Sequence, residues 1–305
     1  MVFFLISGYI ITCVAIREDV KTFVVRRFFR IYPLYVLAVV IEIILGFFIK
    51  GIPVPPLSII LPRITLMGDF FGTPYALGSV EWTLRVEIYF YIVTAILLKM
   101  GVFKRPKILP FIYSAIIVSL QYFGPFNQVY GWSNGYISMF MSFLFVGSCI
   151  YLYEKNIANR YVIFLIGVYA WLSYLISMPY INYTLYKSHF LTIAIILFLT
   201  AWIYRRGFKN VTWVVFLSEL TYSIYIFHNW MMNYFMDLAA HIGLSTIQSN
   251  IFALCCLFVF CTAVHFCVEK FFIGIGTKVI TLLKSHKYGA NKKITAEEKE
   301  LETVR

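Results

Sequence analysis

Apolar stretches long enough to form helices follow one another along almost the whole chain, and this pattern limits the fold more than any other feature. They fall at roughly 2–16, 31–49, 81–100, 107–123, 135–153, 161–177, 189–204, 214–238 and 249–270. A helix needs about 20 residues to cross a bilayer, with ~17 tolerated. Apolar residues make up 61% of the chain and charged residues only 13%, too few charges for a water-soluble surface. The sequence therefore predicts an all-α, polytopic transmembrane helix bundle of about nine spans.

The basic residues predict how this bundle is oriented. Between the spans, alternate connections hold only Lys50, Arg63 and Lys187, and Arg85 lies inside a span. The remaining 22 of the 26 lysines and arginines lie in or beside the other connections and the C-terminal segment. This is the positive-inside pattern, which predicts a cytoplasmic C-terminus. The net charge of +12 is thus explained by topology, and nucleic acid is not an expected partner. We expect a membrane domain over 1–284 and a charged cytoplasmic tail over 285–305.

The N-terminal stretch predicts a further helix. Nine spans with a cytoplasmic C-terminus place Met1 outside, and no signal-peptide features accompany it. The stretch 2–16 would rise about 22 Å as a helix, short of a hydrocarbon core of ~30 Å. We therefore expect at least one helix before Met1, which would give an even-numbered bundle with both ends in the cytoplasm.

Ionisable residues inside a span are costly, so each is a functional candidate. In EWTLRVEIYFY, Glu81 and Arg85 are four residues apart and can pair on one helix face. Glu87 points away from Arg85, on a stripe with Thr83 and Tyr91, which leaves a carboxylate toward the outer leaflet. Such a group could act as a general base or orient a histidine. It could equally be an interfacial glutamate satisfied by a neighbouring helix.

A cluster of arginines precedes the second span. In FVVRRFFRIYP, Arg26, Arg27 and Arg30 are spaced so that their guanidinium groups can converge. Arginine forks bind phosphate oxygens through paired hydrogen bonds. The alternative is a topology signal that contacts anionic lipid.

The eighth span carries polar residues at helical spacing. Thr221, Tyr225 and His228 share a stripe, and His228 would lie near the middle of the membrane. A lone histidine at that depth is usually a hydrogen-bonded packing contact, and catalysis is the alternative.

Other polar residues predict packing. We interpret Glu42 and the His265–Glu269 pair as polar contacts between helices. Ser7 and Gly8 predict close helix approach. All six cysteines lie in apolar stretches without metal-site spacing, so no metal or disulfide site is expected.

Four motifs in order resemble the integral-membrane acyltransferase 3 family. They are FFLISGYII (Phe3 to Ile11), RRFFRIYPLY (Arg26 to Tyr35), WTLRVEIYFY (Trp82 to Tyr91) and YSIYIFH (Tyr222 to His228). The resemblance implies ten core helices and O-acylation of cell-surface or exported glycans. An acyl group, most simply acetyl, would pass from cytoplasmic acyl-CoA to a sugar hydroxyl in the inner (plasma) membrane, with no other cofactor.

The resemblance also assigns roles to residues. The motif containing Arg26, Arg27 and Arg30 would contact acyl-CoA, whereas Glu87 and His228 match catalytic-motif residues. Trp82 matches the aromatic partner of Glu87, whereas Arg85 lies where the family often has a small or polar residue. We expect Trp82, Arg85, Tyr91 and Tyr225 to position the acceptor. The family's presumed catalytic histidine lies on a first core helix that has no counterpart here. The alternatives are therefore an inactive, truncated family member and a glycan transporter or flippase.

Overall fold

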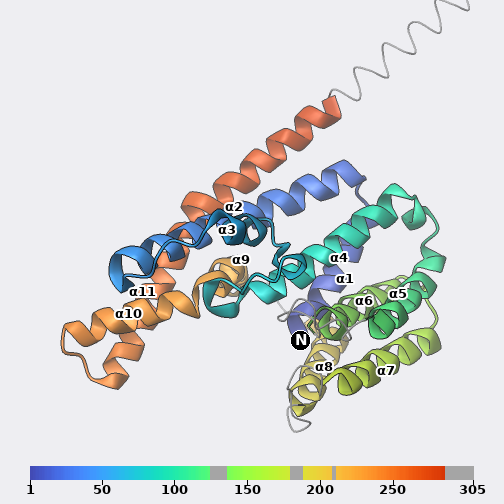
Figure 1. Cartoon of the computed structure of the whole chain (residues 1–305). Helices are drawn as coiled ribbons and strands as arrows, with labels where there is room; N and C mark the ends of the chain where they lie inside the picture. The colour runs from blue at the N-terminus through green and yellow to red at the C-terminus, as the bar shows by residue number, and fades with distance from the viewer. Residues whose placement is uncertain (124–135, 179–187, 208–210, 286–305) are drawn as a thin grey trace, which may run out of the picture.

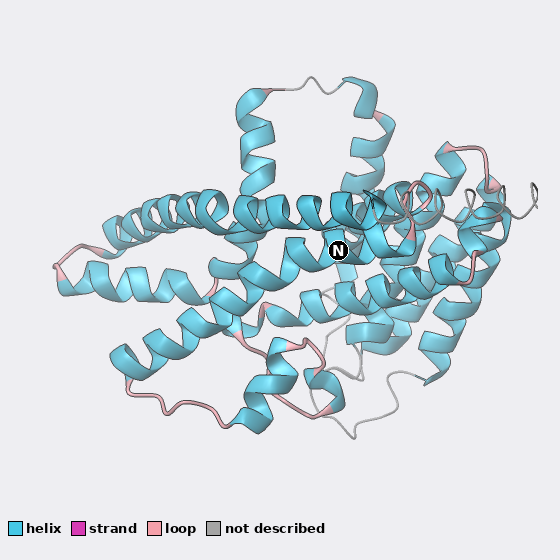
Figure 2. Ribbon diagram, turned by 90° about the horizontal axis from the view of Figure 1, so that it is seen from above, coloured by secondary structure: helices cyan, strands magenta, loops and turns pink. Residues whose placement is uncertain are grey.

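The protein is helical throughout the part that the structure describes. A computed structural model describes residues 1–123, 136–178, 188–207 and 211–285, where helices are joined by loops and no strand occurs (Figure 1, Figure 2). The helices are α1 (Val2–Ala15), α2 (Val20–Lys50), α3 (Leu57–Ile64), α4 (Glu81–Lys99), α5 (Leu109–Phe123), α6 (Tyr136–Glu154), α7 (Arg160–Ser177), α8 (Ser188–Ile203), α9 (Thr212–Phe227), α10 (Trp230–His241) and α11 (Thr246–Val264). The predicted all-α class is confirmed.

The helices form two groups, with α4 between them. One group contains α1 and α5 to α8, in which α6 packs on α1, α5 and α7. The other contains α2, α3 and α9 to α11, in which α11 packs on α9 and α10 (Figure 1). Helix α4 contacts α1 and α6 on one side and α2 on the other. Residues on α4 are therefore placed to join the two groups.

Three described helices are both long enough and apolar enough to cross a membrane: Val20–Lys50, Ile137–Glu154 and Thr246–Ser285. Shorter apolar helices cover Val2–Ala15, Arg160–Ile176, Thr192–Ile203 and Thr212–Phe227. Together they support a polytopic membrane protein, while the count of nine spans stays a prediction.

Two predicted boundaries of the second and last spans need correction. Helix α2 begins at Val20 rather than 31, because Asp19 caps it by accepting hydrogen bonds from Thr22. The arginine cluster consequently lies on a helix and not in a connection. The last helix continues through a π-helical turn, His265–Glu269, to Ser285 rather than ending at 270. The predicted tail from 286 onward lies outside the described residues.

The predicted span 214–238 is divided in two. Helix α9 ends at Phe227, and α10 begins at Trp230. Between them, the Asn229 side chain donates a hydrogen bond to the carbonyl of Gly78, 2.5 Å away. That contact joins the break to a loop about 150 residues away in sequence, so a local apolar pattern cannot predict it. His228 is consequently at a helix end.

Small residues bring α1 and α6 into backbone contact, as predicted for Ser7 and Gly8. A Cβ atom added to Gly8 would overlap the carbonyl of Leu144, and one added to Gly147 would overlap the carbonyl of Leu5. The Ser148 hydroxyl donates to the Gly8 carbonyl at 3.2 Å. These contacts fix α1 firmly against α6.

We expect Gly147→Leu to destabilise the protein, because the new side chain meets backbone that cannot move without separating α1 from α6. The cost should reach or exceed the ~1–3 kcal/mol usual for overpacked cores. Thermal unfolding of the detergent-solubilised protein measures it. Gly167→Leu is the matched control, since nothing lies within 4 Å of a Cβ atom at Gly167. Equal melting temperatures for the two variants would contradict the prediction.

Candidate functional site

Glu87 lies where the two helix groups meet. Its side chain is buried, and its Oε1 accepts hydrogen bonds from the Ser7 hydroxyl of α1 at 2.7 Å and from the Tyr91 hydroxyl at 2.5 Å. Tyr91 is four residues further along α4, as the predicted stripe requires. Ser7 as a partner was missed, because its small size suggested packing alone. Glu87 is thus a carboxylate held in place by two hydroxyl donors.

Arg85 forms a separate buried ion cluster. Its guanidinium contacts Glu81 at 2.6 Å and Asp69 at 2.8 Å, and all three side chains are at most 5% exposed. The predicted Glu81–Arg85 pair is confirmed, and so is the separation of Arg85 from Glu87. Asp69 was missed, because it comes from the loop before α4. Glu81 also accepts from the backbone N–H of Ala76 at 2.7 Å. Arg85 therefore holds the 65–80 loop against α4.

The three arginines line a cavity of about 350 Å³ between α2 and the helix that continues α11. Its walls are formed by Arg26, Arg27, Phe29, Arg30, Ile273, Gly276 and Thr277. Arg26 pairs with Glu18, and the guanidinium of Arg27 lies over the ring of Tyr91 at 5.8 Å. The Nε atom of Arg27 is buried with no hydrogen-bond partner. The second wall was missed, because the last apolar stretch was expected to end at 270, whereas the helix continues to Ser285.

His228 is an exposed residue at the end of α9, not a buried one. Its Nδ1 lies 2.7 Å from the carbonyl oxygen of Tyr225. A carbonyl can only accept, so Nδ1 carries the proton and Nε2 is the basic nitrogen of the neutral ring. The Tyr225 hydroxyl is hydrogen-bonded to the hydroxyl of Thr83, and Thr83 lies one turn before Glu87 on α4. No direct contact joins His228 and Glu87 among the described side chains.

Trp82 is packed between the helices of the first group. Its ring lies 4.7 Å from that of Phe140 on α6 and 5.9 Å from that of Phe4 on α1. It thus helps to set the position of α4 beside Glu87.

The π-helical turn carries a buried pair, His265 and Glu269. His265 Nδ1 lies 2.9 Å from Glu269, which also accepts from the Ser223 hydroxyl at 3.0 Å. The other ring nitrogen of His265 lies 3.5 Å from Glu219. π-Helical turns often occur at functional sites. The predicted helix–helix contact is confirmed, here between α9 and the turn.

Polar side chains together form a line between the two helix groups. It runs from the arginine cavity through Tyr91, Glu87 with its partner Ser7, Thr83 and Tyr225 to His228. Glu87 and Thr83 are linked by their four-residue spacing on α4 and not by a hydrogen bond. We call this set the polar line. Its hydrogen bonds join α4 to α1 and to α9. A buried carboxylate, hydroxyl groups and a histidine with a basic Nε2 are suited to acid–base chemistry.

Comparison with known proteins assigns the chain to a family. Within the described residues, no group of three His, Cys, Asp or Glu side chains could hold a metal ion. No curated protein and no solved structure matches the chain. A family model described as an acyltransferase domain, that of the acyltransferase 3 family, matches residues 1–269. The match extends from α1 through the π-helical turn and so includes the polar line, and the chain belongs to the acyltransferase 3 family.

Proposed function

We propose that the protein is an O-acyltransferase of the plasma membrane. It would move an acyl group, most simply acetyl, from cytoplasmic acyl-CoA to a sugar hydroxyl of an envelope or exported polysaccharide. The observation that carries this proposal is the polar line, which begins at a cavity with three arginines and ends at a histidine. The positive-inside pattern supports placing the arginine cavity and the C-terminus on the cytoplasmic side.

The arginine cavity suits the phosphates of acyl-CoA. Three guanidinium groups within one turn of α2 offer paired N–H donors that match phosphate oxygens. Arg27 lies deepest, with a buried Nε that has no partner and a guanidinium over Tyr91. A donor bound through its phosphates at Arg26 and Arg30 could therefore extend its thioester toward Tyr91 and Glu87.

The chemistry requires one base and one leaving group. The acceptor hydroxyl gives its proton to a base as its oxygen attacks the thioester carbonyl. The carbon–sulfur bond then breaks, and the CoA thiolate leaves with the electron pair and takes up a proton. The new bond is an ester to the sugar oxygen, so atoms and charge balance without a redox cofactor.

Glu87 and His228 are the groups proposed to handle these protons. Glu87 is buried and held by Ser7 and Tyr91, an arrangement that keeps a carboxylate in one orientation. His228 presents Nε2 at an exposed helix end, where a large glycan could approach. We assign His228 to the acceptor end and Glu87 to the path between donor and acceptor.

The donor end is tested by the binding of radiolabelled acetyl-CoA to the purified protein. Arg27→Ala and Arg30→Ala should each weaken binding at least tenfold, since a charge-assisted hydrogen bond contributes ~1.5–3 kcal/mol. Arg27→Lys should recover little, because lysine keeps the charge and loses the fork. Arg105→Ala removes an exposed arginine elsewhere and serves as the control. If Arg27→Ala and Arg30→Ala bound acetyl-CoA with wild-type affinity, the arginine cluster would serve only as a topology signal.

A further inference from the structure

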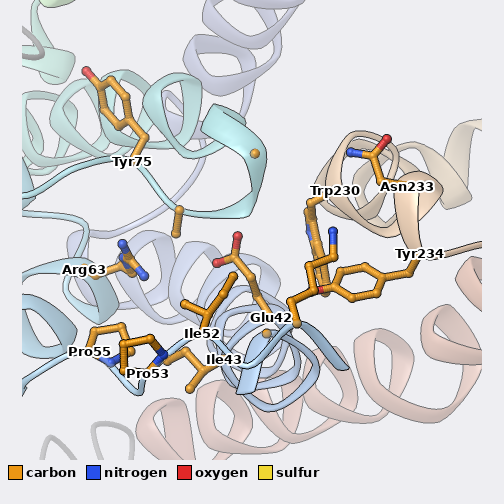
Figure 3. A pocket seen from close by; sticks show the side chains of 14 residues that line it. Glu42, Ile43, Ile52, Pro53, Pro55, Arg63, Tyr75, Trp230, Asn233 and Tyr234 are labelled. Carbon is orange, nitrogen blue, oxygen red and sulfur yellow. The ribbon is translucent and has the colours of Figure 1, made fainter. Parts of the chain in front are cut away.

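A second polar cavity lies toward the other end of α2. It has a volume of about 360 Å³ and is lined by α2, the connection that follows it, α3, the loop before α4 and α10 (Figure 3). The side chains that give it its chemistry are Glu42, Lys50, Arg63, Trp230, Asn233 and Tyr234. Glu42 is twelve residues beyond Arg30 on α2, or about 18 Å along the helix. The volume is within the range of small-molecule sites. None of these residues belongs to the polar line.

Two buried polar atoms at this cavity have no hydrogen-bond partner. They are Oε2 of Glu42 and Nε of Arg63, whose side chain is only 9% exposed. The other oxygen of Glu42 accepts from the backbone N–H of Leu77 at 2.8 Å. A buried polar group without a partner costs ~1–3 kcal/mol. In Figure 3 the Glu42 carboxylate lies between Arg63 and the Trp230 side of the cavity. A ligand with hydroxyl groups could satisfy both atoms.

The cavity wall contains a strained turn that is held from two sides. Leu77, Gly78 and Ser79 have φ values of 57°, 61° and 71°, a region that non-glycine residues seldom adopt. Glu42 bonds the N–H of Leu77, and Asn229 bonds the carbonyl of Gly78. Strained backbone persists where surrounding contacts enforce it, and such positions cluster at ligand sites. The wall is therefore shaped before any ligand binds.

Charge balance at the cavity favours a neutral ligand. The carboxylate of Glu42 faces the guanidinium of Arg63, whereas Lys50 lies 3.9 Å from Asp237 and 4.4 Å from the ring centre of Tyr234. Asp237 does not line the cavity itself, but counting it, the two cations Lys50 and Arg63 are balanced by two carboxylates, so a phosphate or carboxylate gains little from this site.

The lining also combines apolar rings with hydrogen-bonding groups. The Trp230 and Tyr234 rings meet edge to face at 6.1 Å. Aromatic surface beside carboxylate, guanidinium and amide groups matches a sugar, which has apolar C–H faces and many hydroxyls.

We infer that this cavity binds a neutral sugar unit of the acceptor glycan. The inference rests on the proposed function, because it names where the acceptor of that reaction is held. His228 lies two residues before Trp230, at the break between α9 and α10. A glycan held here would therefore have its next sugar close to the basic Nε2 of His228. Glu42 accepts from hydroxyls of the bound unit, and Arg63 donates to its oxygens.

Saturation-transfer NMR on the purified protein in lipid nanodiscs tests the inference. The probes are the neutral trisaccharides maltotriose, cellotriose and triacetylchitotriose, with trigalacturonic acid as the charged counterpart, each at about 10 mM so that even weak binding is seen. At least one neutral probe should bind, and the charged one should bind more weakly. Glu42→Gln keeps an acceptor for Leu77, and Tyr234→Ala removes a half-exposed ring. Each should weaken sugar binding at least tenfold.

The control variant is Tyr204→Ala, which removes an exposed ring that does not line the cavity and should leave sugar binding unchanged. Absence of binding by all neutral probes, or equal binding in Tyr234→Ala and Tyr204→Ala, would overturn the inference. Acetyl-CoA binding on the same preparations separates the two proposals. Intact acetyl-CoA binding without sugar binding overturns only this inference, whereas sugar binding without acetyl-CoA binding overturns only the proposed donor.

Discussion

Replacing Glu87 with glutamine should remove nearly all acyl transfer while leaving the fold and acetyl-CoA binding intact. Glutamine has the same shape, and its amide oxygen can still accept from Ser7 and Tyr91. It cannot take up a proton, so the general-base contribution, typically 10²–10⁴-fold, should be lost. The mass shift of acetylated envelope glycans in cells that express the protein measures the change. His228→Gln should cause a loss of similar size if both groups act in one reaction, because residues that act as a unit are not additive.

The control is the same substitution at another glutamate that accepts a hydrogen bond from a tyrosine hydroxyl. Glu154 accepts from Tyr9 at 2.7 Å at the end of α6 and also pairs with Arg205. Glu154→Gln should retain most acylation, because this residue lies outside the polar line. Acylation by Glu87→Gln at more than about a tenth of the wild-type level would show that Glu87 only supports packing.

Replacing Arg85 with methionine should strongly destabilise the protein. It leaves the carboxylates of Asp69 and Glu81 buried, at 5% and 0% exposure, without their shared cation. Removing one partner of a buried ion pair typically costs ~3–5 kcal/mol. Thermal unfolding in detergent measures the loss. The 65–80 loop should become susceptible to proteases first, because Arg85 holds it through Asp69 and Glu81 holds it through Ala76.

A second variant shows whether the uncompensated carboxylates cause the loss. Adding Asp69→Asn and Glu81→Gln to Arg85→Met removes both negative charges and should recover a clear part of the melting temperature. Arg105→Met, at an exposed position, should leave the melting temperature unchanged. If the triple variant were no more stable than Arg85→Met, lost packing rather than buried charge would explain the effect.

The membrane class and most helices could be predicted from the sequence, because both depend on local properties. Apolar runs predict helices wherever the backbone must satisfy its own hydrogen bonds in lipid. The four-residue spacing that pairs Glu81 with Arg85 and aligns Glu87 with Tyr91 follows from helix geometry alone. The motifs that predicted the family are also short and local, and the family match confirmed that membership.

The contacts that make these residues a site depend on chain segments far apart. Ser7 meets Glu87 across 80 residues, and Asp69 reaches Arg85 from a loop whose course no periodicity describes. The predicted continuous span 214–238 is broken at Asn229, whose side chain donates a hydrogen bond to the carbonyl of Gly78.

The same division holds for the two cavities. The arginines are visible in the sequence, yet the wall opposite them comes from a helix that continues α11 beyond residue 270, where the last span was expected to end. From the sequence, Glu42 is predicted to be a polar contact between helices. In the structure it bonds the turn at Leu77 and lines a cavity with the rings of α10. Local sequence thus determined which residues are helical and which faces they share. Only the tertiary structure decided which faces meet, because such contacts depend on the packing of the whole bundle.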